Sequence, residues 1–256
     1  MTEATVLWAM DGDVATITLN RPKAKNSLRP EDLAELVNCL EAVENAGARC
    51  MIMRGAGGAF SAGRDIAGAD PASDDNEALL RDVIHPVLQA VRALDIPTIA
   101  LIEGPCLGVG FGLAFACDLQ MAADNAVLGS PFRNIGCILD SGGHYHMQQR
   151  IGTHRTFELI YTGRLISGRE AAEMGLINHA FAPDTLEEEV VKLARHIATG
   201  PTRAFAISKR ILRDDLDLDA SLTEEARGQD EACKADDGIE GFRAFQEKRR
   251  PVFKGA

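Results

Sequence analysis

This chain lacks several features that would place it in a specialised class of protein. No apolar run reaches the ~18 residues that a membrane-spanning helix needs. Its first residues do not show the basic-then-apolar order of a signal peptide. The six cysteines form no Cys-x-x-Cys pair, as is typical of a reduced protein. We therefore expect a cytoplasmic globular protein without membrane association, and the 46% hydrophobic and 25% charged residues fit that class.

An excess of positive charge is also missing, since the formal net charge of the 256 residues is −11. A chain of that charge is a poor partner for nucleic acid or for an anionic membrane surface. An anionic small ligand is compatible with it, because two local clusters of basic residues exist; solvated surface is the alternative interpretation. The clusters are Arg21, Lys23, Lys25 and Arg29, and Lys248, Arg249, Arg250 and Lys254.

Strand and helix patterns alternate over about 180 residues and helices complete the chain, which predicts an α/β core with a helical appendix. The expected strands are 5–8, 14–19, 50–53, 97–102, 118–122, 127–128 and 176–181. The expected helices are 30–43, 78–94, 113–116, 141–150, 155–161, 167–174, 186–197, 204–211, 221–235 and 237–248. Pro86 should kink its helix or mark the true start, and the polar segment 69–76 should be mobile. We divide the chain into 1–195 and 196–256, as one functional unit.

Two glycine-rich turns follow predicted buried strands, one around Gly63 and the other around Gly108 and Gly110. The second is no dinucleotide fingerprint, because the last glycine of Gly-x-Gly-x-x-Gly is replaced by Leu113, and the lysine of a phosphate-binding loop is missing. Tight turns without a ligand are one interpretation. The other is that each turn offers one backbone N–H to the same carbonyl oxygen, where one donor is worth roughly 3–4 kcal/mol in the transition state.

A single carboxylate, Asp140, follows the apolar run 135–139. We expect it to face the glycine turns and to move a proton while the turns hold an oxyanion. Apolar neighbours, namely Phe132, Ile138 and Leu139, should raise its pKa and make it a better base. The alternative is that Asp140 only caps the helix that follows.

Four motifs together resemble the crotonase (enoyl-CoA hydratase/isomerase) superfamily. They are Asn20-Arg21-Pro22 with Asn26-Ser27-Leu28, the segment 59–66, Gly104 with Gly108-Val109-Gly110, and the closing Phe242, Phe245, Lys248, Arg249 and Phe253. The resemblance implies a crotonase-like spiral of ββα units with a helical C-terminal trimerisation region. It also implies a homo-trimer or hexamer (a dimer of trimers) and an acyl-CoA substrate. No metal and no cofactor apart from the substrate's own coenzyme A are implied.

The resemblance also assigns residues. The oxyanion donors would be the backbone N–H groups of Arg64 and Val109. The residues implied in substrate binding are Ala24, Ala62, Asp65, Ile66, Gly110 and Phe132 along the path of the substrate, and Phe253 and Lys254, which would approach coenzyme A in the same or a neighbouring subunit.

The most informative feature is a departure from the family pattern. Hydratases of the family carry two glutamates, and this chain has Gly112 and Phe132 at those positions. Neither residue can activate water. Asp140 matches the position that several family isomerases use, most closely those of the PaaG type, so we expect an isomerase that shifts a double bond by proton transfer through Asp140.

Two other functions fit the same residues. A dehalogenase-like or other hydrolase would use Asp140 as a nucleophile and His85 as a base, although Phe132 replaces that branch's tryptophan and a histidine before Pro86 is also typical of a helix start or of the surface. A non-catalytic acyl-CoA binding protein is the alternative from another class.

Overall fold

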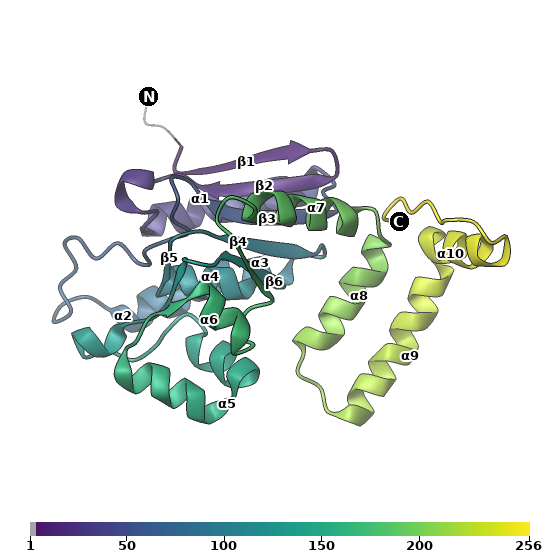
Figure 1. Cartoon of the computed structure of the whole chain (residues 1–256). Coiled ribbons are helices and arrows are strands. Elements are labelled where there is room, and N and C mark those ends of the chain that lie inside the picture. The colour runs from purple at the N-terminus through teal and green to yellow at the C-terminus, as the bar shows by residue number, and fades with distance from the viewer. Residues whose placement is uncertain (1–3) are drawn as a thin grey trace.

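The chain begins with an antiparallel hairpin that forms one edge of the main sheet (Figure 1). The computed structural model describes residues 4–256. Strands β1 (Val6–Asp11) and β2 (Val14–Leu19) pair from Val6 opposite Leu19 to Asp11 opposite Val14. Between them Gly12 adopts a φ of 59°, a conformation that suits a tight hairpin turn. The predicted hairpin is therefore confirmed.

The main sheet has six strands in the order β1-β2-β3-β4-β6-β9, and every pair after the hairpin is parallel. The added strands are β3 (Cys50–Gly55), β4 (Thr98–Ile102), β6 (Leu119–Ala123) and β9 (His179–Phe181). All five residues of β4 are buried, as expected of a parallel strand covered on both faces.

A second, three-stranded sheet lies beside the first and was only partly predicted. It consists of β5 (Pro105–Leu107), β7 (Val127–Gly129) and β8 (Ile166–Ser167), in that order. The sequence pattern ended the apolar run at Gly104-Pro105 and did not predict β5. Pro105 is the first residue of that strand, a position at which a missing N–H is tolerated.

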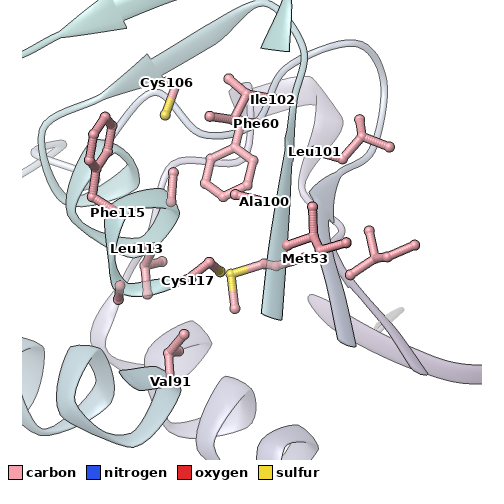
Figure 2. Packing of buried hydrophobic residues seen from close by; sticks show 14 of the residues in the cluster. Met53, Phe60, Val91, Ala100, Leu101, Ile102, Cys106, Leu113, Phe115 and Cys117 are labelled. Atoms are coloured by element: carbon pink, nitrogen blue, oxygen red, sulfur yellow. The ribbon is translucent and has the colours of Figure 1, made fainter. Parts of the chain in front are cut away.

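Helices surround the sheets and pack into one hydrophobic core. They are α1 (Pro30–Asn45), α4 (Val109–Ala116), α5 (Gly143–Thr162), α6 (Gly168–Glu173) and α7 (Leu186–Ala198). All eight residues of α4 are buried. Figure 2 shows Leu113 and Phe115 of α4 in the same cluster as Met53 of β3 and Phe60. Helix α4 is thus a fixed part of the core, and it carries one of the glycine turns at its start.

The helix predicted at 78–94 is continuous but has three parts. These are α2 (Asn76–Ala78), a π-helical turn (Leu79–Ile84) and α3 (His85–Ala93). The His85 N–H donates to the carbonyl of Leu80, five residues back. Pro86 lies in the first turn of α3, directly after the π-helical turn. Because the helix begins at Asn76 and runs through this point, Pro86 does not mark its start, and a kink at Pro86 stays a prediction.

The predicted helices 141–150 and 155–161 are joined in α5, with a non-helical Gly152 (φ 75°, ψ 166°) between them. The polar segment 69–76 is mostly exposed, and its mobility stays a prediction. The apolar run 135–139 is not a buried segment. It follows the short 3-10 helix η3 (Phe132–Ile135), and the side chains of Ile135 and Ile138 are 63% and 79% exposed.

The last helices leave the core and form an arm (Figure 1). They are α8 (Thr202–Arg213), α9 (Leu218–Lys234) and α10 (Asp236–Gln246). The division that we placed between 195 and 196 lies within α7, which packs on β3 and β4. Large apolar side chains are exposed along the arm, namely Leu212, Leu218, Leu222, Ile239, Phe242 and Phe245.

Candidate active site

The two glycine turns lie against each other because the segment after β3 pairs with β5. The Ser61 N–H donates to the carbonyl of Pro105 (2.9 Å), and the Leu107 N–H donates to the carbonyl of Ser61 (2.9 Å). Gly63 and Gly108 both have positive φ, 95° and 54°. A Cβ on Gly63 would be 2.8 Å from the carbonyl oxygen of Leu107, so only glycine allows this approach.

Each turn presents one free backbone N–H. The N–H of Leu28 donates to the carbonyl of Gly63, and the carbonyl of Leu28 accepts from the N–H of Asp65 (2.8 Å each). Arg64 lies between these two partners, so its own N–H points away from Leu28. Val109 is the first residue of α4, where an N–H has no partner within the helix and the helix dipole is positive. Within residues 4–256, neither N–H donates a hydrogen bond. Two such donors on adjoining turns can bind one oxyanion.

Asp140 lies just before α5 with a half-buried side chain whose Oδ1 atom is fully buried. Among the described residues, Oδ1 has no hydrogen-bond partner. Gly142 is the N-cap of α5 and no side chain caps it, so the prediction that Asp140 only caps this helix is wrong. A buried carboxyl group without a partner is available for chemistry.

Burial raises the pKa of Asp140, while the Ser141 side chain and then the charges of His85 and Arg64 oppose the rise. The predicted direction is therefore confirmed. The prediction that apolar neighbours bury the carboxyl group holds for Leu139, which is 5% exposed. The prediction for Ile138 is wrong, because a side chain that is 79% exposed cannot exclude water from the carboxyl group.

Phe132 and Gly110 both adjoin the turns. The ring carbon Cζ of Phe132 is 3.6 Å from the position of a Cβ on Gly108, so the ring lies over the second turn. Gly110 faces Ser61, whose Cβ is 2.6 Å from the Cβ position on that glycine. Gly110 thus holds α4 against the first turn, and its contact with substrate stays a prediction.

The residues implied along the coenzyme A path form one neighbourhood at the first turn. The Ala62 N–H donates to the carbonyl of Lys25 (2.8 Å), which places Ala62 beside the end of the 3-10 helix η1 (Pro22–Ala24). The carboxylate of Asp65 already binds Arg21 (3.0 Å), and Ile66 is 63% exposed. Substrate contact by these residues also stays a prediction.

Phe253 and Lys254 are not brought to the turns of their own chain. The carbonyl of Phe253 accepts from Arg49 (3.2 Å), and the Lys254 N–H donates to Asp237 of α10 (2.6 Å). In Figure 1 the C-terminal tail lies beside α10, across the molecule from β5. A role in coenzyme A binding therefore requires the neighbouring-subunit alternative.

His85 is the first residue of α3, inside the continuous helix that begins at Asn76, and it is exposed, as the surface interpretation predicted. It also lies close enough to Asp140 for its positive charge to lower the pKa of that carboxyl group. The structure therefore brings the two residues of the hydrolase alternative into one neighbourhood.

Two buried polar residues that organise the first turn were not predicted. The Ser61 hydroxyl donates to the carbonyl of Asn26 (2.8 Å) and accepts from the N–H of Gly63 (3.1 Å). The Asn26 amide donates to the carbonyls of Ala56 and Ala59 (2.9 and 2.7 Å). For Ser61 the signal in the sequence is its place beside a glycine turn, because a small polar residue there often bonds nearby backbone. Asn26 has no glycine near it in the sequence and shows no such signal.

The two sheets with their covering helices and the two adjoining glycine turns match the class of crotonase-fold proteins. Its sequence matches the family model for enoyl-CoA hydratase/isomerase over residues 9–256. YngF of Bacillus subtilis (strain 168), named for enoyl-CoA hydratase/isomerase, is 39% identical over 249 residues, or 94% of this chain and 95% of YngF. The 1,2-epoxyphenylacetyl-CoA isomerase of Escherichia coli (strain K12) is 33% identical over 258 residues, 98% of each chain.

A solved structure agrees with these sequence matches. The crystal structure of an enoyl-CoA hydratase from Bacillus anthracis has a TM-score of 0.91 and 35% identity, covering 98% of this chain and 100% of that chain. The chain belongs to the enoyl-CoA hydratase/isomerase family, within the crotonase superfamily, and this family acts on acyl-CoA thioesters. Between residues 4 and 256, no helix has the length and apolar character needed to cross a membrane.

Proposed function

We propose that this protein is an acyl-CoA isomerase that moves a double bond, or an unsaturation derived from a ring or epoxide, by proton transfer through Asp140. The observation that carries the proposal is the buried Asp140 carboxyl group, whose Oδ1 has no hydrogen-bond partner among residues 4–256 and whose pKa is raised by burial. A carboxylate in such a place is a stronger base than an ordinary aspartate.

The reaction needs only groups that this chain supplies. The thioester carbonyl accepts hydrogen bonds from the N–H groups of Arg64 and Val109. Asp140 then removes a proton from carbon, and the electron pair of that C–H bond moves into a dienolate whose charge lies on the held oxygen. The carboxylic acid returns the proton to another carbon, so the double bond shifts. Neither water nor a cofactor besides the substrate's coenzyme A takes part.

Hydration is a weaker proposal for chemical reasons. The side chains of Gly112 and Phe132 offer no acid or base, and water addition needs one to activate the water. Within residues 4–256, no group of three or more His, Cys, Asp or Glu side chains is placed to hold a metal ion that could replace them. Asp140 is the base that we assign to the proposed isomerisation.

The test is deuterium exchange in heavy water with a panel of crotonyl-CoA, 3-hexenoyl-CoA and phenylacetyl-CoA. The wild-type protein should introduce deuterium at the α or γ carbon of at least one of them. Asp140→Asn should bind the same thioester and lose about 10²–10⁴-fold in exchange rate. Full exchange by that variant overturns the mechanism. Binding by the wild-type protein with neither exchange nor formation of a covalent ester identifies a non-catalytic acyl-CoA binding protein.

Hydrolysis through a covalent ester is the second candidate, and the nearness of His85 to Asp140 favours it. Asp140 would attack an electron-poor carbon of the acyl group and displace its leaving group. Water activated by His85 would then cleave the ester. Rapid quenching with 4-chlorobenzoyl-CoA followed by mass spectrometry tests this candidate, because an ester on Asp140 adds the mass of the acyl-CoA without chloride.

For the assembly we propose a homo-trimer or a dimer of trimers. The support is the arm of α8, α9 and α10, where Phe245 is 85% exposed and Leu218 is 72% exposed. Apolar side chains gathered on a projecting arm are typical of a surface that another chain covers. Light scattering coupled to gel filtration should give three or six times the chain mass of 27.5 kDa, and a monomer contradicts the proposal.

A further inference from the structure

We infer that the contact between Gly112 and Ser141 is a positioning device that fixes the Asp140 carboxyl group relative to the oxyanion-binding N–H groups. This inference rests on the proposed function, since it assigns positioning residues to the same site. It is carried by an unusual backbone conformation at Ser141 and by the close approach of that residue to α4.

Ser141 has a positive φ of 52° although it is not glycine, and it is only 1% exposed. A residue with a side chain rarely adopts this conformation, and it persists only where the surrounding structure enforces it. Gly142, the next residue, also has a positive φ, of 80°. The backbone therefore turns sharply directly after Asp140, and the packing of Ser141 fixes that turn.

The packing partner is Gly112 in the middle of α4. A Cβ on Gly112 would be 2.5 Å from both the Cβ and the carbonyl oxygen of Ser141. Contacts this short do not occur between real atoms, so only glycine at this position lets the Ser141 main chain reach the helix. The same approach removes the space that any larger side chain at 112 would need.

Helix α4 thereby connects the two halves of the site. Its first residue, Val109, supplies one oxyanion N–H, and Gly112 lies three residues further along, a rise of about 4.5 Å. Because α4 is fully buried, it is a rigid spacer between the held oxygen and the segment that carries Asp140. Proton transfer requires such fixed spacing, since a displacement of 1 Å can reduce a rate by about 10²-fold.

The Ser141 hydroxyl has a separate effect. Its Oγ is buried and makes no hydrogen bond within the described residues. It is nevertheless near enough to the carboxyl group to lower the pKa of Asp140. Removing the hydroxyl alone should therefore change the pH profile, whereas disturbing the Gly112 contact should change the position of the base.

The central experiment compares Gly112→Ala with Gly200→Ala. A Cβ on Gly200 would be 2.5 Å from the ring of Phe205, so the control also adds a methyl group in steric conflict, here just before α8 with a side chain and not with the backbone next to Asp140. The readout is deuterium exchange into the probe of the panel that the wild-type protein exchanges fastest, together with the Kd for butanoyl-CoA and the Tm.

We expect Gly112→Ala to lose about 10²-fold in exchange rate with unchanged Kd, and Gly200→Ala to lower the Tm with an unchanged exchange rate. Ser141→Gly should keep or raise the Tm, because glycine tolerates the positive φ, and should still exchange more slowly. Ser141→Ala should retain exchange and shift its acid limb to higher pH.

If Gly112→Ala and Gly200→Ala exchange deuterium at equal rates per folded molecule, the inference is overturned. It is also overturned if Ser141→Gly exchanges deuterium at the wild-type rate. Asp140→Asn is measured in parallel. If that variant exchanges normally, the proposed function fails. If it loses exchange while the Gly112 and Ser141 variants keep theirs, only the positioning inference fails.

Discussion

Gly63 and Gly108 lie close together at the base of the two turns, where a Cβ on Gly108 would be 3.9 Å from the Cα of Gly63. A methyl group on Gly63 would be only 2.8 Å from the carbonyl oxygen of Leu107. That oxygen belongs to the backbone and cannot move aside without separating the turns. The spacing of the two proposed oxyanion donors, the N–H groups of Arg64 and Val109, therefore depends on the absence of a side chain at 63.

Gly63→Ala should accordingly lower both stability and activity. We expect a loss of about 1–3 kcal/mol in the free energy of unfolding, and slower deuterium exchange because the N–H groups of Arg64 and Val109 diverge. Denaturant unfolding and the exchange assay measure the two effects.

Gly68→Ala is the matched control for that change. Gly68 has a similar φ of 84°, but a Cβ there has open space around it. This variant should show only the cost of the positive φ and should exchange at the wild-type rate. If both variants lose exchange equally, the contact between the turns does not control the oxyanion site.

Asp140→Asn should be more stable than the wild-type protein at neutral pH. Burial raises the pKa of Asp140 in the folded state, so its ionisation opposes folding once the pH exceeds the ordinary aspartate value. Below that value the group is protonated in both states and the penalty vanishes. The Tm difference between variant and wild type should therefore grow as the pH rises from the ordinary aspartate value to the folded-state pKa, and then level off. A variant that is less stable than wild type at neutral pH contradicts this prediction.

Arg21→Met should loosen the first turn from α1. Arg21 binds Asp65 (3.0 Å) and Asp32 (3.2 Å), with side-chain exposures of 20% for Arg21, 20% for Asp65 and 2% for Asp32. For such a partly buried network we expect a loss of about 1–2 kcal/mol at pH 7. The hydrogen bond from Arg21 lowers the pKa of Asp65.

The pH dependence of that loss has a definite sign. Stabilisation by a lowered carboxyl pKa is complete above the ordinary value and disappears as the pH falls through the folded-state value. The difference between Arg21→Met and wild type should therefore shrink in acid. Arg81→Met, which removes exposed pairs with Glu77 and Asp82, should have little effect at any pH. A constant difference for Arg21→Met excludes Asp65 as the source.

Much of the fold was predictable because its signals are local. The hairpin of β1 and β2 follows from alternation around Asp11-Gly12-Asp13, and α1 follows from an apolar stripe whose Leu33, Leu36, Leu40 and Val43 are all buried. The three-residue strand β5 was not predictable, because its backbone is satisfied by Ser61 and β7 rather than by any pattern of its own.

The site was predictable where chemistry requires a residue type and not where packing decides. Glycine turns and a lone carboxylate in an apolar run identify Gly63, Gly108 and Asp140. No sequence pattern shows that Gly112 contacts Ser141, because the two residues meet only when α4 packs on the start of α5. The exposure of Ile138 was missed for a similar reason, since an apolar run does not reveal which of its members turn toward the solvent.

His85→Ala distinguishes the two candidate reactions. If Asp140 is the proton carrier, deuterium exchange should persist without His85, because no step uses the imidazole. If Asp140 is a nucleophile, the variant should still form the ester with 4-chlorobenzoyl-CoA but fail to hydrolyse it, so the covalent species should accumulate.

The pH profile supplies a second readout for the same variant. The positive charge of His85 lowers the pKa of Asp140, so its removal should raise that pKa and move the acid limb of exchange to higher pH. His85→Lys keeps a positive charge without an imidazole, and it should restore the wild-type limb but not ester hydrolysis. Loss of exchange in both variants at every pH would mean that His85 takes part in the proton transfer, and Asp140 would then not be the sole carrier.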